Sequence, residues 1–381
     1  MAVAANPGIA YAEAGVRAAT GRARQAGLYP NPVLGATGDH NTPALDGGSL
    51  GGFAEQRIVA GSKLGLAKTA GDQDRMVAEE MQKAARLRLL TQVRTLFYRG
   101  LGEQRLFEVR KEMAELAGRT AQTLAELNNV GQADRPDLLA AQVDARRAEL
   151  AVTMAQNALD RTWREIAAVV NQPGLARAAL QGDLETLPKL DAESALARVL
   201  SESPEVRAAQ IEADRSGTLV KRARAERIPD VRVRGGVRYN REPLDRSGRA
   251  SPVVGNEGFF DAGVEIPLFN RNQGSIAAAQ AEADQARLGV DRGRLALRQR
   301  FAAVYREYSD ASAAVAQYQT EMIPKAREAF EMYTGNFRQM AVAYPQVLAA
   351  QRTFIQLEDD YVAQLTAAWR AALEIDGLLV E

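Results

Sequence analysis

The chain has 381 residues, with 48 basic and 48 acidic side chains, one histidine and no cysteine. A balanced charge provides no overall field that would attract nucleic acid, so we expect no nucleic-acid partner. Without cysteine, and with His40 as the one imidazole, the sequence excludes a dedicated thiolate or multi-histidine metal site. We therefore expect no metal ligands and no cofactor.

No apolar stretch reaches the roughly 18 residues that a transmembrane helix requires. The segment from Met1 to Pro7 lacks a basic region followed by an apolar core, so we expect no signal peptide in this sequence. Two interpretations remain: a cytoplasmic protein, or the mature form of an exported one. Alanine, arginine, glutamate, glutamine and leucine dominate, and this composition is typical of long helices.

An internal repeat organises the sequence. The segment Pro136–Gln142 reads PDLLAAQ, and 209 residues later Pro345–Gln351 reads PQVLAAQ. Each copy follows a long proline-poor segment and a polar turn. A proline in the first turn of a helix lacks only an N–H that would be unpaired there anyway. The repeat therefore predicts two copies of a long helical hairpin.

The first structural repeat is predicted over residues 1–170, with a linker at 171–203 that contains one or two short helices. It begins with a helix from Pro7 to about Gly27. A strand pair at 33–60 follows, with a loop at 42–52, and then a hairpin at 65–170 with its tip near 128–136. The proline-free segment before this tip, of roughly 66 residues, corresponds to about 100 Å of helix.

The second structural repeat is predicted over residues 204–381. A helix from Pro204 leads to a strand pair at 230–268, and a hairpin at 275–380 has its tip near 337–345. In both strands apolar side chains alternate with polar ones, which is the period-2 pattern of a strand with two different faces. We expect Pro324 to bend the second long helix mildly.

These elements lack a sufficient core within one chain. Four strands cannot close a barrel, because the smallest barrels contain about eight strands. Helical hairpins about 100 Å long need partners, and copies of the same chain are the simplest partners. If the apolar strand faces contact lipid, neighbouring chains must close the sheet, because unpaired backbone groups are not tolerated there. Apolar-out and polar-in alternation is typical of a water-filled membrane barrel.

Four segments, in this order along the chain, resemble the TolC-like outer-membrane efflux family and specifically its heavy-metal branch, the cobalt-zinc-cadmium type. They are Gln25–Pro32 before the first strand, Val130–Gly131 with Asp137–Gln142 at the first tip, Ile266–Gly274 after the fourth strand, and Ile323–Ala326 on the second long helix. The resemblance extends over nearly the whole chain. The second tip departs from the family pattern, because it lacks the usual glycine and acidic residue.

The resemblance implies a mainly α fold with a small β part. In a homotrimer, the hairpins form an α-barrel of twelve helices across the periplasm, and four strands per chain contribute to a 12-stranded transmembrane β-barrel in the outer-membrane lipid. The implied partners are a periplasmic adaptor protein and an inner-membrane RND-type pump. The implied function is passive conduction of substrate to the exterior by a tripartite efflux system, with heavy-metal cations as the substrate and no enzymatic activity.

Three groups of residues are candidates for function. The candidate adaptor-docking and gating residues at the tips are Asn129, Gly131, Gln132, Asp134, Arg135, Gln339, Met340 and Tyr344. The candidate lining of the barrel lumen is Arg232, Arg234, Arg238 and Glu265, and a possible tunnel constriction is Asp359 with Asp360. Each group has a simpler interpretation, namely turn-forming residues, solvated strand faces and exposed helix positions.

A second function class stays open at this point. A soluble or periplasmic coiled-coil adaptor or scaffold also contains helical hairpins, although adaptors have one hairpin and not two that each follow a strand pair. Trp163 and Trp369 are interpreted as helix-packing anchors. No phosphate-binding loop, nucleophile–base pair or paired-carboxylate site is present, so no feature supports an enzyme.

Overall fold

The computed structural model describes residues 5–39, 48–244, 252–339 and 341–379. His40 and Met340 lie outside these ranges. Among the residues described, no helix is long and apolar enough to cross a membrane. The chain forms two compact units: residues 1–12, 81–206 and 293–381 make up a helical unit, and residues 13–80 and 207–292 make up a unit that contains the sheet.

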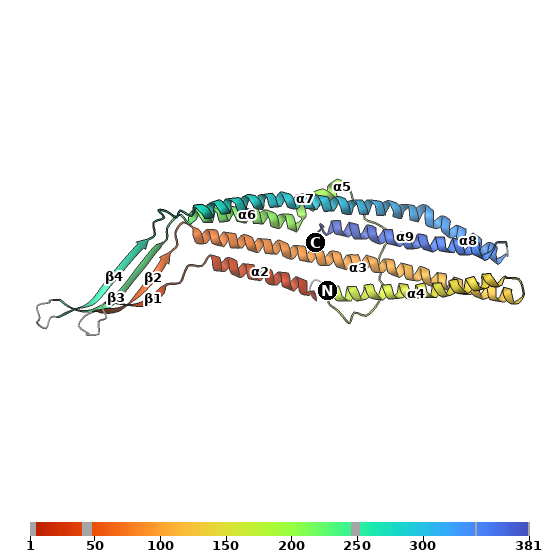
Figure 1. The fold of residues 1–381 in the computed structure, drawn as a ribbon, viewed down its shortest axis with the longest axis horizontal. Coiled ribbons are helices and arrows are strands. Elements are labelled where there is room, and N and C mark those ends of the chain that lie inside the picture. Colours follow the sequence, from red (N-terminus) through yellow and green to blue (C-terminus); the bar gives the residue numbers. More distant parts are fainter. Residues whose placement is uncertain (1–4, 40–47, 245–251, 340, 380–381) are drawn as a thin grey trace. The chain divides into compact units, whose positions relative to one another are not determined.

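The helices follow the order that the repeat predicts (Figure 1). They are α2 (Pro7–Ala26), α3 (Lys63–Asn129), α4 (Arg135–Val169), α5 (Ala192–Glu202), α6 (Pro204–Ala225), α7 (Gln273–Gln317), α8 (Ile323–Arg338) and α9 (Tyr344–Asp376). The strands are β1 (Val33–Asp39), β2 (Ser49–Ile58), β3 (Val231–Pro243) and β4 (Val253–Val264). The predicted linker at 171–203 contains one helix, α5, where one or two short helices are predicted.

The four strands form one antiparallel sheet in the order β1-β2-β3-β4. Each repeat supplies a hairpin, and the pairing of β2 with β3 joins the two repeats. Strands β1 and β4 are therefore the two edges of this sheet. Each edge leaves one row of backbone N–H and C=O groups without a strand partner within the sheet.

Two strand boundaries differ from the sequence prediction. Strand β2 begins at Ser49, so part of the predicted loop at 42–52 is strand. Gly51 is needed for close packing, because a Cβ atom there would lie 2.2 Å from the carbonyl oxygen of Val237 on β3. At the other end, β4 stops at Val264 and not near Leu268. Pro267 lacks the N–H with which a strand residue donates to its neighbour.

The two faces of the sheet differ in chemistry and in exposure. Directly opposed residues of neighbouring strands point to the same side of a sheet. The register therefore places Leu34, Leu50, Val237 and Phe260 on one face, where they are 61–78% exposed. The opposite face carries charged side chains and two phenylalanines, and most of its β2 and β3 side chains are partly covered. The sheet is therefore apolar outside and polar on its more enclosed side.

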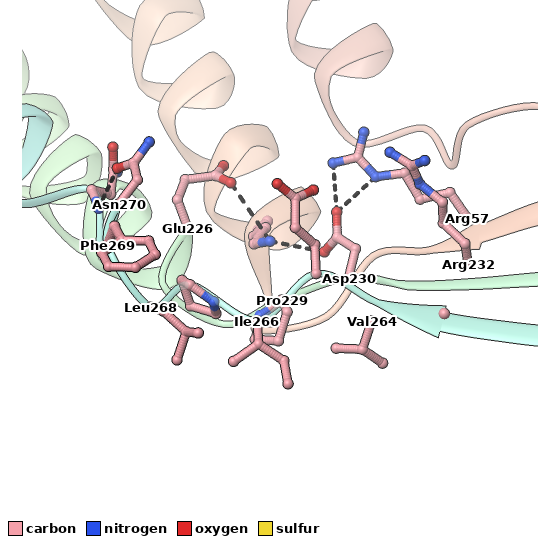
Figure 2. A pocket seen from close by; sticks show the side chains of 15 residues that line it. Arg57, Glu226, Pro229, Asp230, Arg232, Val264, Ile266, Leu268, Phe269 and Asn270 are labelled. Atoms are coloured by element: carbon pink, nitrogen blue, oxygen red, sulfur yellow. Dashed lines mark hydrogen bonds and ion pairs between the residues drawn. The ribbon is translucent and has the colours of Figure 1, made fainter.

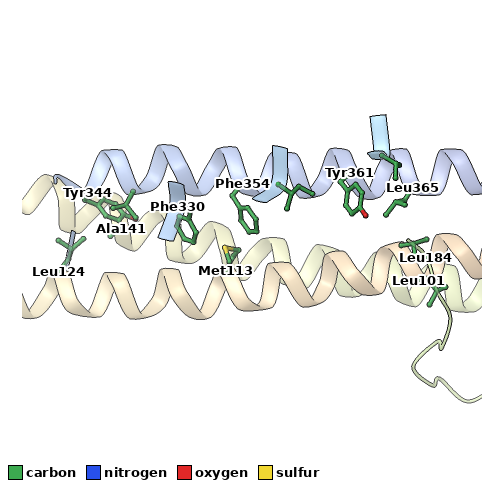
Figure 3. Close-up of a cluster of buried hydrophobic side chains, with 13 residues drawn as sticks. Leu101, Met113, Leu124, Ala141, Leu184, Phe330, Tyr344, Phe354, Tyr361 and Leu365 are labelled. Carbon is green, nitrogen blue, oxygen red and sulfur yellow. The ribbon is translucent and has the colours of Figure 1, made fainter. Parts of the chain in front are cut away.

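The helical unit is built around one long apolar cluster (Figure 3). Both hairpins contribute to it, with Met113 and Leu124 from α3, Ala141 from α4, and Phe354 and other residues from α9. Ring pairs strengthen the packing, since Phe330 and Phe354 stack with their centroids 6.1 Å apart. A second cluster around Val199, Phe301 and Ile375 buries one face of α5.

The second long helix is interrupted where Pro324 was expected to bend it. A π-helical turn, Tyr318–Met322, separates α7 from α8, and Pro324 lies in the first turn of α8. Proline has no N–H for the bond to the carbonyl four residues earlier, so the local helix widens at this point. The mild bend at Pro324 stays a prediction, and the structure places a π-helical turn directly before it.

We expect Gly51→Ala to destabilise the sheet by about 1–3 kcal/mol, because its new methyl group would overlap the β3 backbone. Gly258→Ala is the matched control, since a Cβ atom at that strand position has no atom within 4 Å. Thermal unfolding followed by circular dichroism measures both. Equal unfolding midpoints for the two variants would contradict the packing role assigned to Gly51.

Candidate functional site

The first tip is a polar turn between α3 and α4 that satisfies its own backbone. Gly131 has φ +76°, a left-handed conformation that glycine adopts without strain. Asn128 Nδ2 donates to the carbonyl of Ala133 at 2.8 Å, and Gln132 N donates to that of Leu127 at 2.8 Å. The candidates Asn129, Gly131, Gln132, Asp134 and Arg135 are all exposed here. Turn chemistry explains Gly131, whereas the other exposed side chains at this tip are available to a partner.

Tyr344 at the second tip is not a surface residue. It begins α9, is 2% exposed, and its hydroxyl lies 3.5 Å from Asp144 Oδ2 on α4. Arg352 of α9 donates to the same carboxylate at 3.3 Å. Burial, with the nearby negative charge of Asp144, raises the pKa of Tyr344 to about 12. Tyr344 therefore connects the two hairpins near their tips through its contact with Asp144. Gln339, which follows the last residue of α8, has an exposed side chain.

Both carboxylates of the predicted pair on α9 accept hydrogen bonds from other residues of the same chain. Asp359 accepts two hydrogen bonds from Arg110 of α3, at 2.9 and 3.2 Å, and Asp360 accepts one from Gln356 at 2.9 Å. Sequence reasoning missed their neighbour Glu358, which is 1% exposed and paired with Arg105 at 3.2 Å. This buried pair links α3 to α9. Its position could not be recognised from spacing, because a carboxylate on a long helix is normally exposed.

The arginines of β3 have different environments. Arg238 donates to Glu257 on β4 at 2.9 Å and to Asp39 on β1 at 3.0 Å. The guanidinium of Arg234 lies 3.8 Å from the ring centroid of Phe53, a cation–π contact. The register also places Glu55 and Asp261 beside Arg234 on the same face. Carboxylates of the neighbouring strands thus offset the positive charges of the three β3 arginines.

A pocket of about 850 Å³ lies at the junction between the strands and the helices that follow them (Figure 2). Arg232 and Glu265 both line it, and Glu265 lies just beyond the end of β4. At its centre the Asp230 carboxylate accepts from Arg57 Nε at 2.7 Å, from Lys63 Nζ at 2.8 Å and from the Ala60 N–H at 3.1 Å. Asp230 thereby joins the start of β3 to the end of β2 and the start of α3.

The charges of this junction are strongly coupled. Burial of Asp230 would raise its pKa, but the hydrogen bonds from Lys63, the Ala60 N–H and Arg57 outweigh that effect and lower the pKa to about 2. Lys63, with a side chain only 8% exposed, also approaches Glu226 at 3.5 Å. Asp230 is not among the candidate site residues that the sequence provides. Its one signal was its place directly after Pro229, where a strand begins.

Comparisons with known proteins agree with this architecture. Residues 195–379 match the family described as outer membrane efflux protein. The chain is 27% identical to the cobalt-zinc-cadmium resistance protein CzcC of Cupriavidus metallidurans, and the match covers 100% of this chain and 88% of CzcC.

Solved structures show the same fold. The outer membrane protein VceC of Vibrio cholerae superposes with a TM-score of 0.77 at 20% identity, covering 99% of this chain and 94% of VceC. The MtrE outer membrane channel of Neisseria gonorrhoeae, in its open state, gives a TM-score of 0.79 at 16% identity, covering 99% and 87%. The predicted TolC-like fold is thereby confirmed.

We expect Asp230→Asn to lower the free energy of unfolding at pH 7 by about 2 kcal/mol, because 1.36 kcal/mol corresponds to each unit of pKa depression. The pKa of Asp230 is lower in the folded chain than its ordinary 3.8. Its stabilisation is therefore complete above about pH 4 and is lost as the pH falls towards 2. Denaturant unfolding of both proteins between pH 7 and pH 2 measures this convergence.

The control for this experiment is Glu226→Gln. Its partly exposed carboxylate, 40% exposed and 3.5 Å from Lys63, is expected to contribute less than about 1 kcal/mol. A constant difference between wild type and Asp230→Asn across the whole pH range would contradict the linkage assigned to Asp230.

Proposed function

We propose that this chain, of which residues 195–379 match the outer membrane efflux protein family, is the outer-membrane channel of a tripartite efflux system, conducting heavy-metal cations passively from the periplasm to the exterior. The single observation that carries this proposal is the sheet that is apolar outside and polar on its enclosed side. A water-soluble domain would bury Leu34, Val237 and Phe260, whereas here they are 70–78% exposed.

Lipid is the solvent that suits this outer face. In a bilayer, however, the unpaired backbone groups of β1 and β4 could not remain exposed. The proposed homotrimer pairs β4 of each copy with β1 of the next. Three four-stranded sheets then form a closed 12-stranded barrel, whose polar interior is lined by Arg232, Arg234 and Arg238 with their neighbouring carboxylates.

The proposed substrate class rests on the similarity to CzcC, whose name assigns it to cobalt, zinc and cadmium resistance. Among the described residues, no group of three or more histidine, aspartate or glutamate side chains could hold a metal ion. The proposed role needs no such group, because a wide water-filled passage conducts an ion without binding it tightly. The pump and the adaptor would then select the cargo.

The tips are the proposed docking surface for the periplasmic adaptor. The exposed candidates are Asn129, Gln132, Asp134, Arg135 and Gln339. Tyr344 has a different proposed role, because its contact with Asp144, together with that of Arg352, links the hairpins near the tips. We assign these contacts to holding the tunnel entrance narrow until an adaptor binds.

A reconstitution experiment tests the channel itself. The purified chain is expected to need detergent, to elute as a trimer and to produce stepwise conductance in planar lipid bilayers. A strain that lacks its own outer-membrane efflux channel but retains adaptor and pump is expected to regain tolerance to cobalt, zinc or cadmium salts when it produces this chain. A monodisperse monomer in detergent-free buffer would instead indicate a soluble adaptor or scaffold.

The gate assignment has its own test. Asp144→Ala removes the acceptor of both Tyr344 and Arg352, so we expect a larger single-channel conductance in bilayers. Glu149→Ala is the matched control, because this exposed carboxylate of α4 pairs with Arg146 of the same helix. Unchanged conductance in a folded Asp144→Ala trimer would overturn the gate assignment and leave the channel proposal intact.

A further inference from the structure

One level of the polar face of the sheet is built from phenylalanine and glycine. Across the strands the two residue types alternate, with Gly35 on β1, Phe53 on β2, Gly236 on β3 and Phe259 on β4. These directly opposed positions all lie on the same face. Both rings are partly covered, whereas the adjacent Phe260 of the outer face is 71% exposed. We call this row of four residues the aromatic level, and each repeat contributes one glycine and one ring to it.

Each ring packs over the glycine of the neighbouring strand. A Cβ atom on Gly35 would lie 2.5 Å from Cζ and 2.7 Å from Cε1 of Phe53. A Cβ atom on Gly236 would lie 2.7 Å from Cζ of Phe259. Glycine inside a strand weakens the strand, and a close approach of another group is one reason for its presence there. The two glycines therefore allow the rings to pack against the neighbouring strands.

The aromatic level also holds the guanidinium of Arg234. Its Cζ atom lies 3.8 Å from the ring centroid of Phe53 and 5.7 Å from that of Phe259. The register places Glu55 and Asp261 directly beside Arg234. Within the part of the chain that the structure describes, neither carboxylate has a hydrogen bond or an ion pair. Arg234 therefore contacts the aromatic rings in preference to the two acidic side chains beside it.

Arg238 shows the alternative arrangement on the same face. Its guanidinium is bonded to Glu257 of β4 at 2.9 Å and to Asp39 of β1 at 3.0 Å. Arg234 has the same chemistry, but the Phe53 ring occupies its guanidinium. A cation–π contact is comparable in free energy with an exposed ion pair, so the ring can compete with a carboxylate for the arginine. The carboxylates beside Arg234 are thereby left without a cationic partner.

We propose that the aromatic level determines the conductance and the charge preference of the channel: its glycines keep the rings out of the passage, and Phe53 holds Arg234 away from the neighbouring carboxylates. This inference rests on the proposed channel and identifies residues that decide what passes through it. Each chain contributes two rings and one arginine, so three copies place six rings and three arginines at this level. The unpaired carboxylates beside them favour hydrated cations over anions.

The surroundings explain why the rings need the glycines. The interior of a water-filled barrel is polar, so phenylalanine is unexpected there. Rings that projected into the lumen would narrow it, and an apolar constriction excludes water and ions. Packed over glycine, the rings instead leave the passage open, and Arg234 covers one of them with a polar group. The glycines and the arginine thus make the rings compatible with conduction.

A variant of Gly35 tests the effect on conductance. In planar bilayers Gly35→Ala is expected to lower the single-channel conductance, because the new methyl group displaces the Phe53 ring towards the lumen. Gly35 does not have a positive φ, so alanine adds no backbone strain there. Adding Phe53→Leu removes the overlapping ring atoms and is expected to restore the conductance. Gly263→Ala is the matched control, since a Cβ atom at this position of the same face meets no atom within 4 Å.

The reversal potential across a potassium chloride gradient tests the effect on charge preference. The wild-type channel is expected to prefer cations. Phe53→Leu is expected to shift the reversal potential towards zero, because the released Arg234 can pair with Glu55 or Asp261. Arg234→Gln is expected to shift it in the opposite direction. In the Arg234→Gln background, Phe53→Leu should have no further effect, and a purely structural role of the ring would not produce this dependence.

The outcomes separate this inference from the channel proposal. Equal conductance of Gly35→Ala and wild type, or a loss that Phe53→Leu does not restore, would overturn the role of the glycines. An equal shift of the reversal potential by Phe53→Leu with and without Arg234, or no shift, would overturn the role of the stacked arginine. If Gly35→Ala fails to assemble, the reversal potential of Phe53→Leu still decides the inference. A wild-type protein without conductance would instead count against the channel itself.

Discussion

The constraint on which this structure depends is that a single chain cannot pair the backbone groups at both edges of its sheet or cover the apolar face of that sheet. Strands β1 and β4 are edges, each with a row of backbone groups that have no strand partner within the sheet. Large side chains such as Leu34 and Phe260 cover the outer face. Water makes the apolar face costly, and lipid makes the open edges costly. In the proposed assembly, closure of the sheet by further copies within lipid removes both costs together.

The helical hairpins face a similar constraint in water. Each hairpin buries a narrow seam, and a helix of 67 residues is too long for one partner helix to cover all its apolar positions. Within the chain the seam between hairpins is covered by aromatic rings and by the Arg105–Glu358 and Arg110–Asp359 pairs. Residues at the corresponding positions of the other copy of the repeat remain exposed. The duplicated positions thus carry exposed Val143 and Leu150 on α4 where α9 carries the paired Arg352 and Asp359.

The junction at Asp230 connects these two kinds of structure. Strand ends and helix starts meet there through one carboxylate that accepts from Arg57, Lys63 and a backbone N–H. Such a bonded carboxylate is well suited to fix the direction in which strands continue into helices. The neighbouring pocket residues Ile266 and Leu268 are 65–70% exposed, so apolar exposure continues beyond the end of β4.

The sequence by itself determined the repeat, the order of the elements and the two-faced character of the strands, because these follow from local periodicity and from the positions of proline. The structure ends α3 at Asn129 and begins α9 at Tyr344, the residue before Pro345. Tertiary structure alone decided which polar groups meet. It turned Arg234 towards Phe53, paired Arg238 with Asp39 and Glu257, and buried Tyr344 and Glu358. Those outcomes depend on strand register and helix rotation, which are set by packing between segments far apart in the chain.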